Sequence, residues 1–230
     1  MMKFLMIGWL GLLLSLPTYA QIQDSLRRTT FSVALVPQYL VQQAIRVDLE
    51  MPLVRGKQMH RLTVSPYLYS GRTRRYEYAG VPTVVQQPDD YGETRVSGFG
   101  LEVLDKYTVR LINRRPSKLY LAYGLSYHRI GLDYTAYEPV PFTEAGVSLF
   151  RFGFADQQER VHRLDVIGLL GVKGFFYNSP LFFDLFAGPV LKNSWLNSDS
   201  GVVRDHDAPF DHGFNGVTYR VGAALGVLIF

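Results

Sequence analysis

The sequence contains no cysteine. A chain without Cys has no disulfide framework and cannot carry a lipid on an N-terminal Cys, so its stability must come from side-chain packing or backbone pairing. After its first twenty residues it also lacks any run of 18 uninterrupted apolar residues, which excludes a transmembrane helix there. No segment has the spacing of a convincing amphipathic helix. The formal net charge of +4 is too small to indicate a nucleic-acid partner.

The first twenty residues have the pattern of a secretory signal peptide. Lys3 supplies a positive start, residues 4–16 are mainly apolar, and residues 17–20 form a small-residue cleavage motif. The apolar stretch is shorter than the roughly 20 residues that span a bilayer as a helix. We therefore predict cleavage after residue 20 and a single domain over residues 21–230.

The rest of the chain follows a period of two. In residues 44–51, apolar Ile45, Val47 and Leu49 alternate with charged side chains, which is typical of a strand and not of a helix. Most segments with this pattern reach the roughly 9–11 residues that cross a bilayer as a tilted strand. Across the chain, the pattern predicts strands at residues 29–36, 43–53, 60–70, 95–111, 118–130, 160–174, 181–195 and 216–230.

The connections between these strands alternate in length. Short links at 54–59, 112–117 and 175–180 alternate with long ones at 71–94, 131–159 and 196–215, and with one of moderate length at 37–42. An outer-membrane barrel has short periplasmic turns and long extracellular loops, and an even strand count leaves both termini in the periplasm. A ten-strand alternative needs further strands at 131–137 and 147–154. We favour eight strands, with 147–154 extending a hairpin beyond the membrane.

The signal-peptide pattern, the eight strands, the loop asymmetry and the aromatic Phe230 resemble small bacterial outer-membrane barrels of the OmpA transmembrane-domain and OmpX type. This resemblance implies an all-β, eight-stranded antiparallel up-and-down transmembrane β-barrel in a Gram-negative outer membrane. In that group a terminal Phe such as Phe230 belongs to the signal read by the barrel-assembly machinery. We expect no cofactor and no nucleic-acid partner.

The inward faces of the predicted strands carry charges of both signs. An eight-stranded barrel is just wide enough inside for side chains, so we expect ion pairs that fill the interior; the alternative is a narrow selective channel. The expected interior charges are Arg46, Asp48, Glu50, Arg61, Glu102, Lys106, Arg110, Lys118, Arg163, Asp165, Lys173 and Asp184.

Asp105 does not fit this pattern. It shares the outward parity of Leu101 and Val103 and would face lipid in a regular strand. Either a bulge near Asp105 and Lys106 shifts the register, or Asp105 lies near a membrane interface where the energetic penalty is small.

Ser126 and His128 lie two residues apart on one strand face. Lipid A deacylases are similar small barrels that use a serine and a histidine on a strand, so an esterase dyad is a candidate. Ser-x-His is a common pattern, and the sequence does not identify a third group to orient the base. A structural interior His is therefore favoured, and we do not expect an enzyme.

Two of the long loops contain candidate binding groups. The first begins with basic side chains that could contact lipopolysaccharide phosphates: Arg72, Arg74 and Arg75. The last contains oxygen and nitrogen donors that could hold a divalent cation: Asp205, His206, Asp207, Asp211 and His212. Their spacing matches neither an EF-hand nor a zinc signature, so a solvated acidic turn is favoured and no metal is expected.

In the last strand, the sequence leaves open which face meets lipid. Leu225 and Ile229 belong to the heavier apolar face, whereas Leu228 and Phe230 share a face with Arg220. The chain as a whole indicates a structural or surface-interaction membrane protein whose loops contact lipopolysaccharide, a host surface or an envelope protein partner. A narrow porin-like channel is the second hypothesis and a lipid A-modifying hydrolase the third.

Overall fold

A computed structural model describes residues 31–54, 57–73, 93–112, 117–176, 179–198, 206, 208–209 and 211–229. The predicted signal peptide, the loop residues Arg74, Arg75, Asp205 and Asp207, and Phe230 lie outside these ranges. Signal cleavage, the extent of the domain and the assembly role of Phe230 therefore stay predictions. The described segments contain no helix long and apolar enough to cross a membrane.

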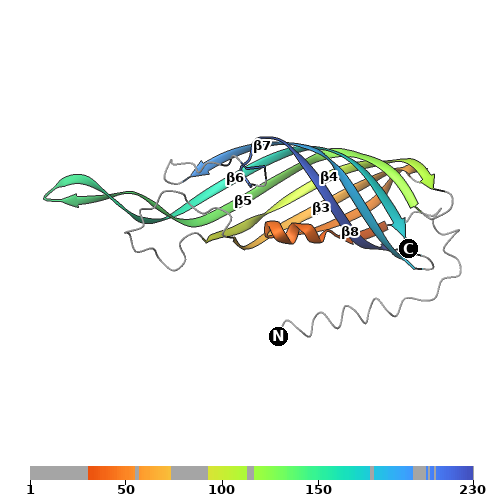
Figure 1. The fold of residues 1–230 in the computed structure, drawn as a ribbon, viewed down its shortest axis with the longest axis horizontal. Helices are drawn as coiled ribbons and strands as arrows, with labels where there is room; N and C mark the ends of the chain where they lie inside the picture. The colour runs from red at the N-terminus through yellow and green to blue at the C-terminus, as the bar shows by residue number, and fades with distance from the viewer. Residues whose placement is uncertain are drawn as a thin grey trace, which may run out of the picture.

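The described chain forms a closed ring of eight antiparallel strands (Figure 1). Each strand pairs with its neighbours in sequence order, and the last strand pairs with the first. The strands are β1 (Phe31–Leu35), β2 (Ala44–Val54), β3 (Lys57–Thr73), β4 (Thr94–Ile112), β5 (Ser117–Glu144), β6 (Val147–Phe175), β7 (Leu181–Ser198) and β8 (Gly216–Ile229). The predicted all-β antiparallel fold is confirmed, and eight strands, not ten, make up the ring.

The β5–β6 hairpin continues far beyond the ring (Figure 1). Its two strands pair without interruption to Glu144 and Val147, whereas β4 pairs with β5 only as far as Tyr134, and β7 with β6 only as far as Glu159. The turn consists of Ala145 and Gly146, both with positive φ (49° and 79°), which matches the twist of a tight hairpin. Residues 147–154 thus extend this hairpin, as the sequence predicted.

The two faces of the ring have opposite polarity. Val103, Leu125 and Val166 are neighbours across β4, β5 and β6, and all three are exposed on the outer face. The residues next to them in the chain include Glu102 and Asp165, which are fully buried inside. Strand alternation produces this arrangement, and it is the reverse of a water-soluble protein, in which charged residues are rarely buried.

The wall is incomplete between β8 and β2, where β1 is short. β1 pairs with β8 only from Phe31 to Leu35, and Val36 then donates its N–H to the carbonyl of Arg46 in β2. The next residue, Pro37, has no N–H to donate toward β8, and the chain turns into the 3₁₀ helix η1 (Pro37–Gln42). The side-chain oxygen of Gln38 instead accepts from the backbone N–H of Ala223 at 3.4 Å.

In β8 the heavier apolar face points outward. Leu225 and Ile229 are exposed, whereas Ala224 and Leu228 are buried and Arg220 reaches the interior. This settles the orientation that the sequence left open.

Asp105 lies on the outer face without a local bulge. The pairing of β4 with β5 is regular through Asp105 and Lys106, and its register shifts only between Thr108 and Arg110, which excludes the bulge and leaves the other alternative, a position near an interface, as a prediction. The carboxylate contacts Nδ1 of His60 at 3.0 Å and accepts from the hydroxyl of Tyr123 at 2.8 Å. These polar partners compensate for its outward position.

Candidate functional site

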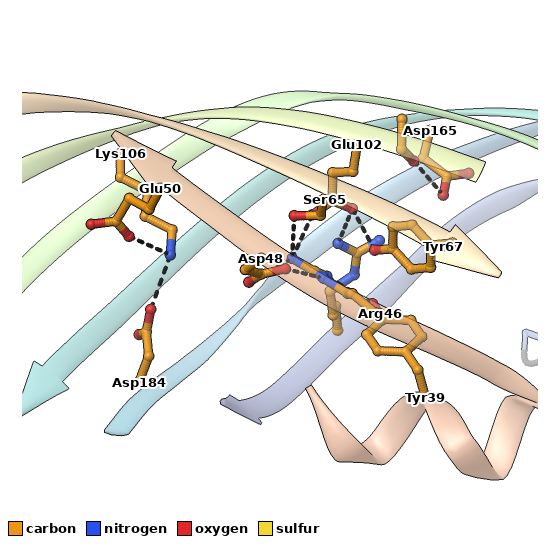
Figure 2. A network of polar contacts seen from close by, with 12 residues as sticks. Tyr39, Arg46, Asp48, Glu50, Ser65, Tyr67, Glu102, Lys106, Asp165 and Asp184 are labelled. Carbon is orange, nitrogen blue, oxygen red and sulfur yellow. Dashed lines mark hydrogen bonds and ion pairs between the residues drawn. The ribbon is translucent and has the colours of Figure 1, made fainter. Parts of the chain in front are cut away.

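Glu102 is the centre of the charged interior. Its side chain is fully buried, and each of its two oxygens contacts a different guanidinium group: Arg46 Nη2 lies 2.8 Å from one and Arg220 Nη1 lies 2.6 Å from the other. The hydroxyl of Tyr67 donates a further bond at 2.9 Å. These partners come from β2, β3 and β8, so one carboxylate on β4 links distant parts of the ring (Figure 2).

Arg46 is enclosed as completely as its partner. It contacts both oxygens of Asp48, at 2.6 and 3.2 Å, and donates to the hydroxyl of Tyr39 at 3.2 Å. The rings of Tyr39 and Tyr67 each lie 5.3 Å from its guanidinium carbon, at cation–π distance. Tyr39 belongs to η1, so the short helix closes the gap in the wall by packing on this arginine.

A second cluster lies toward the end of the ring with the short turns. Glu50 pairs with Arg61, with Lys106 at 3.3 Å and with Lys173 at 3.0 Å. Lys106 also contacts Asp184 at 2.9 Å, so it lies between two carboxylates (Figure 2). The side chain of Arg110, also expected inside, is not among those described.

The candidate hydrolase pair is embedded in a third cluster. His128 Nε2 lies 2.9 Å from Ser126 Oγ, and Ser126 Oγ also donates to Asp165 at 3.1 Å. In a Ser-His-acid triad, the acid binds the imidazole nitrogen that does not contact the nucleophile. In this protein that nitrogen is Nδ1 of His128, and it lies 2.9 Å from the hydroxyl of Tyr69. Ser126 and His128 are 2% and 0% exposed, and Arg163 pairs with Asp165 at 3.1 Å. These side chains thus form one buried polar cluster inside the ring.

The last long loop turns its described residues into the open end of the ring. His206 Nε2 contacts Glu159 at 2.7 Å, and His212 packs edge-on against Tyr69 at 5.8 Å. Asp211 accepts from the backbone N–H of Ala208. The described His and Asp residues of this loop therefore contact separate partners, and the described residues contain no group of three or more His, Cys, Asp or Glu side chains that could hold a metal ion.

Basic side chains line the outer face of the ring near the long loops. Arg72 of the predicted lipopolysaccharide set is exposed, 3.4 Å from Glu93, and directly opposite Arg95. Arg129 and Arg160 are exposed on the same side of β5 and β6. Arg95, Arg129 and Arg160 were not among the residues that the sequence indicated, although each has outward parity just beyond the apolar part of its strand.

Comparisons with known proteins find similarity only to solved structures, and the sequence identity is low. No protein-family model and no curated protein match the chain. Among solved structures, it is similar to a major outer membrane protein from Thermus thermophilus, with 12% sequence identity, 88% of this chain and 98% of that chain covered, and a TM-score of 0.44.

Proposed function

We propose that this chain is an outer-membrane β-barrel with a filled interior, and that it binds a protein partner at the cell surface through the β5–β6 hairpin. The observation that carries the proposal is the long two-stranded ribbon that leaves the ring (Figure 1). It has exposed aromatic side chains, and both of its edges are unpaired among the described residues.

The outer face supports the membrane location. On β4 the outward residues between Arg95 and Asp105 are uncharged. Ten residue steps of about 3.3 Å at a tilt of about 45° correspond to a height of about 23 Å, close to the roughly 25 Å apolar band of outer-membrane barrels. The short turns then face the periplasm and the hairpin faces outward.

The hairpin has features of a strand-addition site. Beyond Tyr134 and Glu159, its two strands continue for about ten residues, or roughly 33 Å, with no neighbouring strand on either side in the described part of the chain. Phe150 and Phe152 are 70% and 66% exposed. A lone hairpin is marginally stable in water, and its free edges can pair with an extended segment of another protein. A strand of the partner would cover the aromatic side chains and form hydrogen bonds with the free backbone groups of the hairpin edge.

A photo-crosslinking residue at Phe150 in living cells should identify this partner, because the side chain lies on the proposed contact. The purified partner should then bind the wild-type barrel, and Phe150→Ser with Phe152→Ser should weaken that binding at least about tenfold through loss of apolar contact. Phe176→Ser is the matched control, since Phe176 is exposed at the opposite end of the ring. Equal affinity of the hairpin variant and the control would contradict the proposal.

The filled interior predicts a protein without steady conductance. We expect the buried ion pairs of Arg46, Glu102 and Glu50 to block a continuous water path, because an eight-stranded ring is just wide enough inside for side chains. Planar-bilayer recordings of the folded protein should therefore show only the baseline current of the lipid. Steady openings that disappear when Arg46 and Glu50 are neutralised would favour the narrow channel instead.

The outer arginines fit a second contact, with lipopolysaccharide. Guanidinium groups bind phosphate oxygens in pairs, and Arg72, Arg95, Arg129 and Arg160 lie beyond the apolar band, at the level of an outer-leaflet headgroup. Trp195 and Tyr127, both exposed beside His162, have the amphipathic rings that favour this depth. This contact would anchor the barrel and does not replace the hairpin as the binding element.

A further inference from the structure

A cavity lies inside the ring at its short-turn end. The cavity is small, with about 30 Å³ of room for the centres of water-sized molecules, and it is lined by Glu50, Arg61, Lys106, Thr108, Lys118, Tyr120, Lys173, Phe175 and Leu228. Four of these side chains are cationic and one is a carboxylate. Asp184, which contacts Lys106 and Tyr120, brings a second carboxylate to the edge of the cluster. The cavity therefore has an excess of positive charge.

The strand register places like charges directly opposite one another around this cavity. Arg61 of β3 pairs with Lys106 of β4, and Lys118 of β5 pairs with Lys173 of β6. Like charges in directly opposed positions destabilise a sheet. Glu50 and Asp184 offset three of the four cations through the contacts already given.

Lys118 is the cation that these carboxylates do not neutralise. No carboxylate of the described residues forms an ion pair with its ammonium group. The ammonium nitrogen lies 5.7 Å from the centre of the Phe175 ring, at cation–π distance. Thr108 adds a hydroxyl to the same cavity wall. The wall therefore holds the partly buried ammonium of Lys118 and a hydroxyl group, beside two cations that share Glu50 as their acceptor.

We propose that this cavity binds a small oxyanion, phosphate or a carboxylate, which enters from the short-turn end and is held by Lys118, Lys173 and Arg61 with Thr108. Such an anion would neutralise the repulsion between Lys118 and Lys173 and accept the hydrogen bonds that this wall offers. The proposal concerns the ring alone and does not depend on the hairpin or its partner.

The test uses the full folded protein in detergent at constant ionic strength. Inorganic phosphate should raise the unfolding temperature, with a rise that grows as the logarithm of its concentration above the dissociation constant. Relaxation of ³¹P in phosphate should report saturable binding with the same dissociation constant. Acetate should compete for the site, whereas chloride at equal ionic strength should have only a small effect. Phosphate and acetate titrations thus show which oxyanion the site prefers.

Lys118→Gln should weaken phosphate binding at least about tenfold, because the unpaired ammonium is the main donor. Arg151→Gln removes the same charge from the exposed hairpin and should bind phosphate like the wild type. Lys118→Arg keeps the charge and should bind phosphate like the wild type. This variant keeps the test valid if Lys118→Gln folds poorly. Absence of saturable phosphate binding by the wild type, an equal effect of chloride, or unchanged binding in Lys118→Gln would each overturn the proposal.

Discussion

Glu102→Gln should lower the free energy of unfolding by about 3–5 kcal/mol, the range for breaking a buried ion pair while its partner stays buried. The substitution keeps the size of the side chain and removes its charge. Arg46 and Arg220 would then face each other across a neutral amide in an enclosed space. A single cation could reorient, but both guanidinium groups are held by other contacts, with Asp48 and with the ring of Tyr39.

Urea unfolding in lipid vesicles measures this loss. Trp195 is the only tryptophan outside the predicted signal peptide, and it lies half exposed on the outer face of β7, so its fluorescence reports the departure of that strand from the membrane. Glu144→Gln is the control: this carboxylate is exposed at the hairpin tip, and its loss should change stability by less than about 0.5 kcal/mol. A Glu102→Gln variant as stable as this control would mean that water already reaches the central cluster, which would favour a channel.

The architecture could be predicted from the sequence because side chains alternate between the two faces of the wall. Where the outer face is apolar and the inner face charged, a strand shows a strict period of two, as residues 44–51 do, and the predicted bounds of β2, β4 and β7 differ from the observed ones by at most three residues. The strands of the hairpin are extended in the same way as those of the ring, so the pattern could not show at which residues β5 and β6 leave the ring.

The parity of β8 was ambiguous for a steric reason. Its inward side consists largely of small residues because aromatic rings from β7 occupy the space: a Cβ on Gly222 would lie 2.4 Å from the ring of Phe186, and one on Gly226 would lie 2.4 Å from the ring of Phe182. Glycine therefore signals a filled interior here, although the sequence alone allowed it to face lipid.

The partners of the interior charges could not be predicted, although the face on which they lie could. Parity places Glu102 inside, but its bond to Arg220 joins residues 118 positions apart and exists only because the ring closes. The partner of His206 could not be predicted either. In the sequence this residue is a candidate metal ligand, and in the structure its imidazole contacts Glu159 of β6. Pairing across a ring depends on strand stagger, which a single strand pattern does not contain.

Leu125→Arg should destabilise the folded protein in lipid by about 2–4 kcal/mol, the cost of a cation on the lipid face near the middle of the bilayer. Leu125 is exposed on the outer face between Val103 and Val166, four residues from Arg129. The guanidinium group of an arginine at this position would have to cross apolar surface to reach water. Phe150→Arg is the matched control, since Phe150 is more exposed still but lies on the hairpin outside the proposed membrane. This substitution should change stability by less than about 0.5 kcal/mol.

If water and not lipid surrounded the ring, an arginine at residue 125 would be as harmless as one at residue 150, and the protein would need no detergent to remain dispersed. A pair of equal urea midpoints in vesicles would therefore reject the membrane location, whereas a lower midpoint for Leu125→Arg alone would place the apolar band of β4, β5 and β6 in the bilayer.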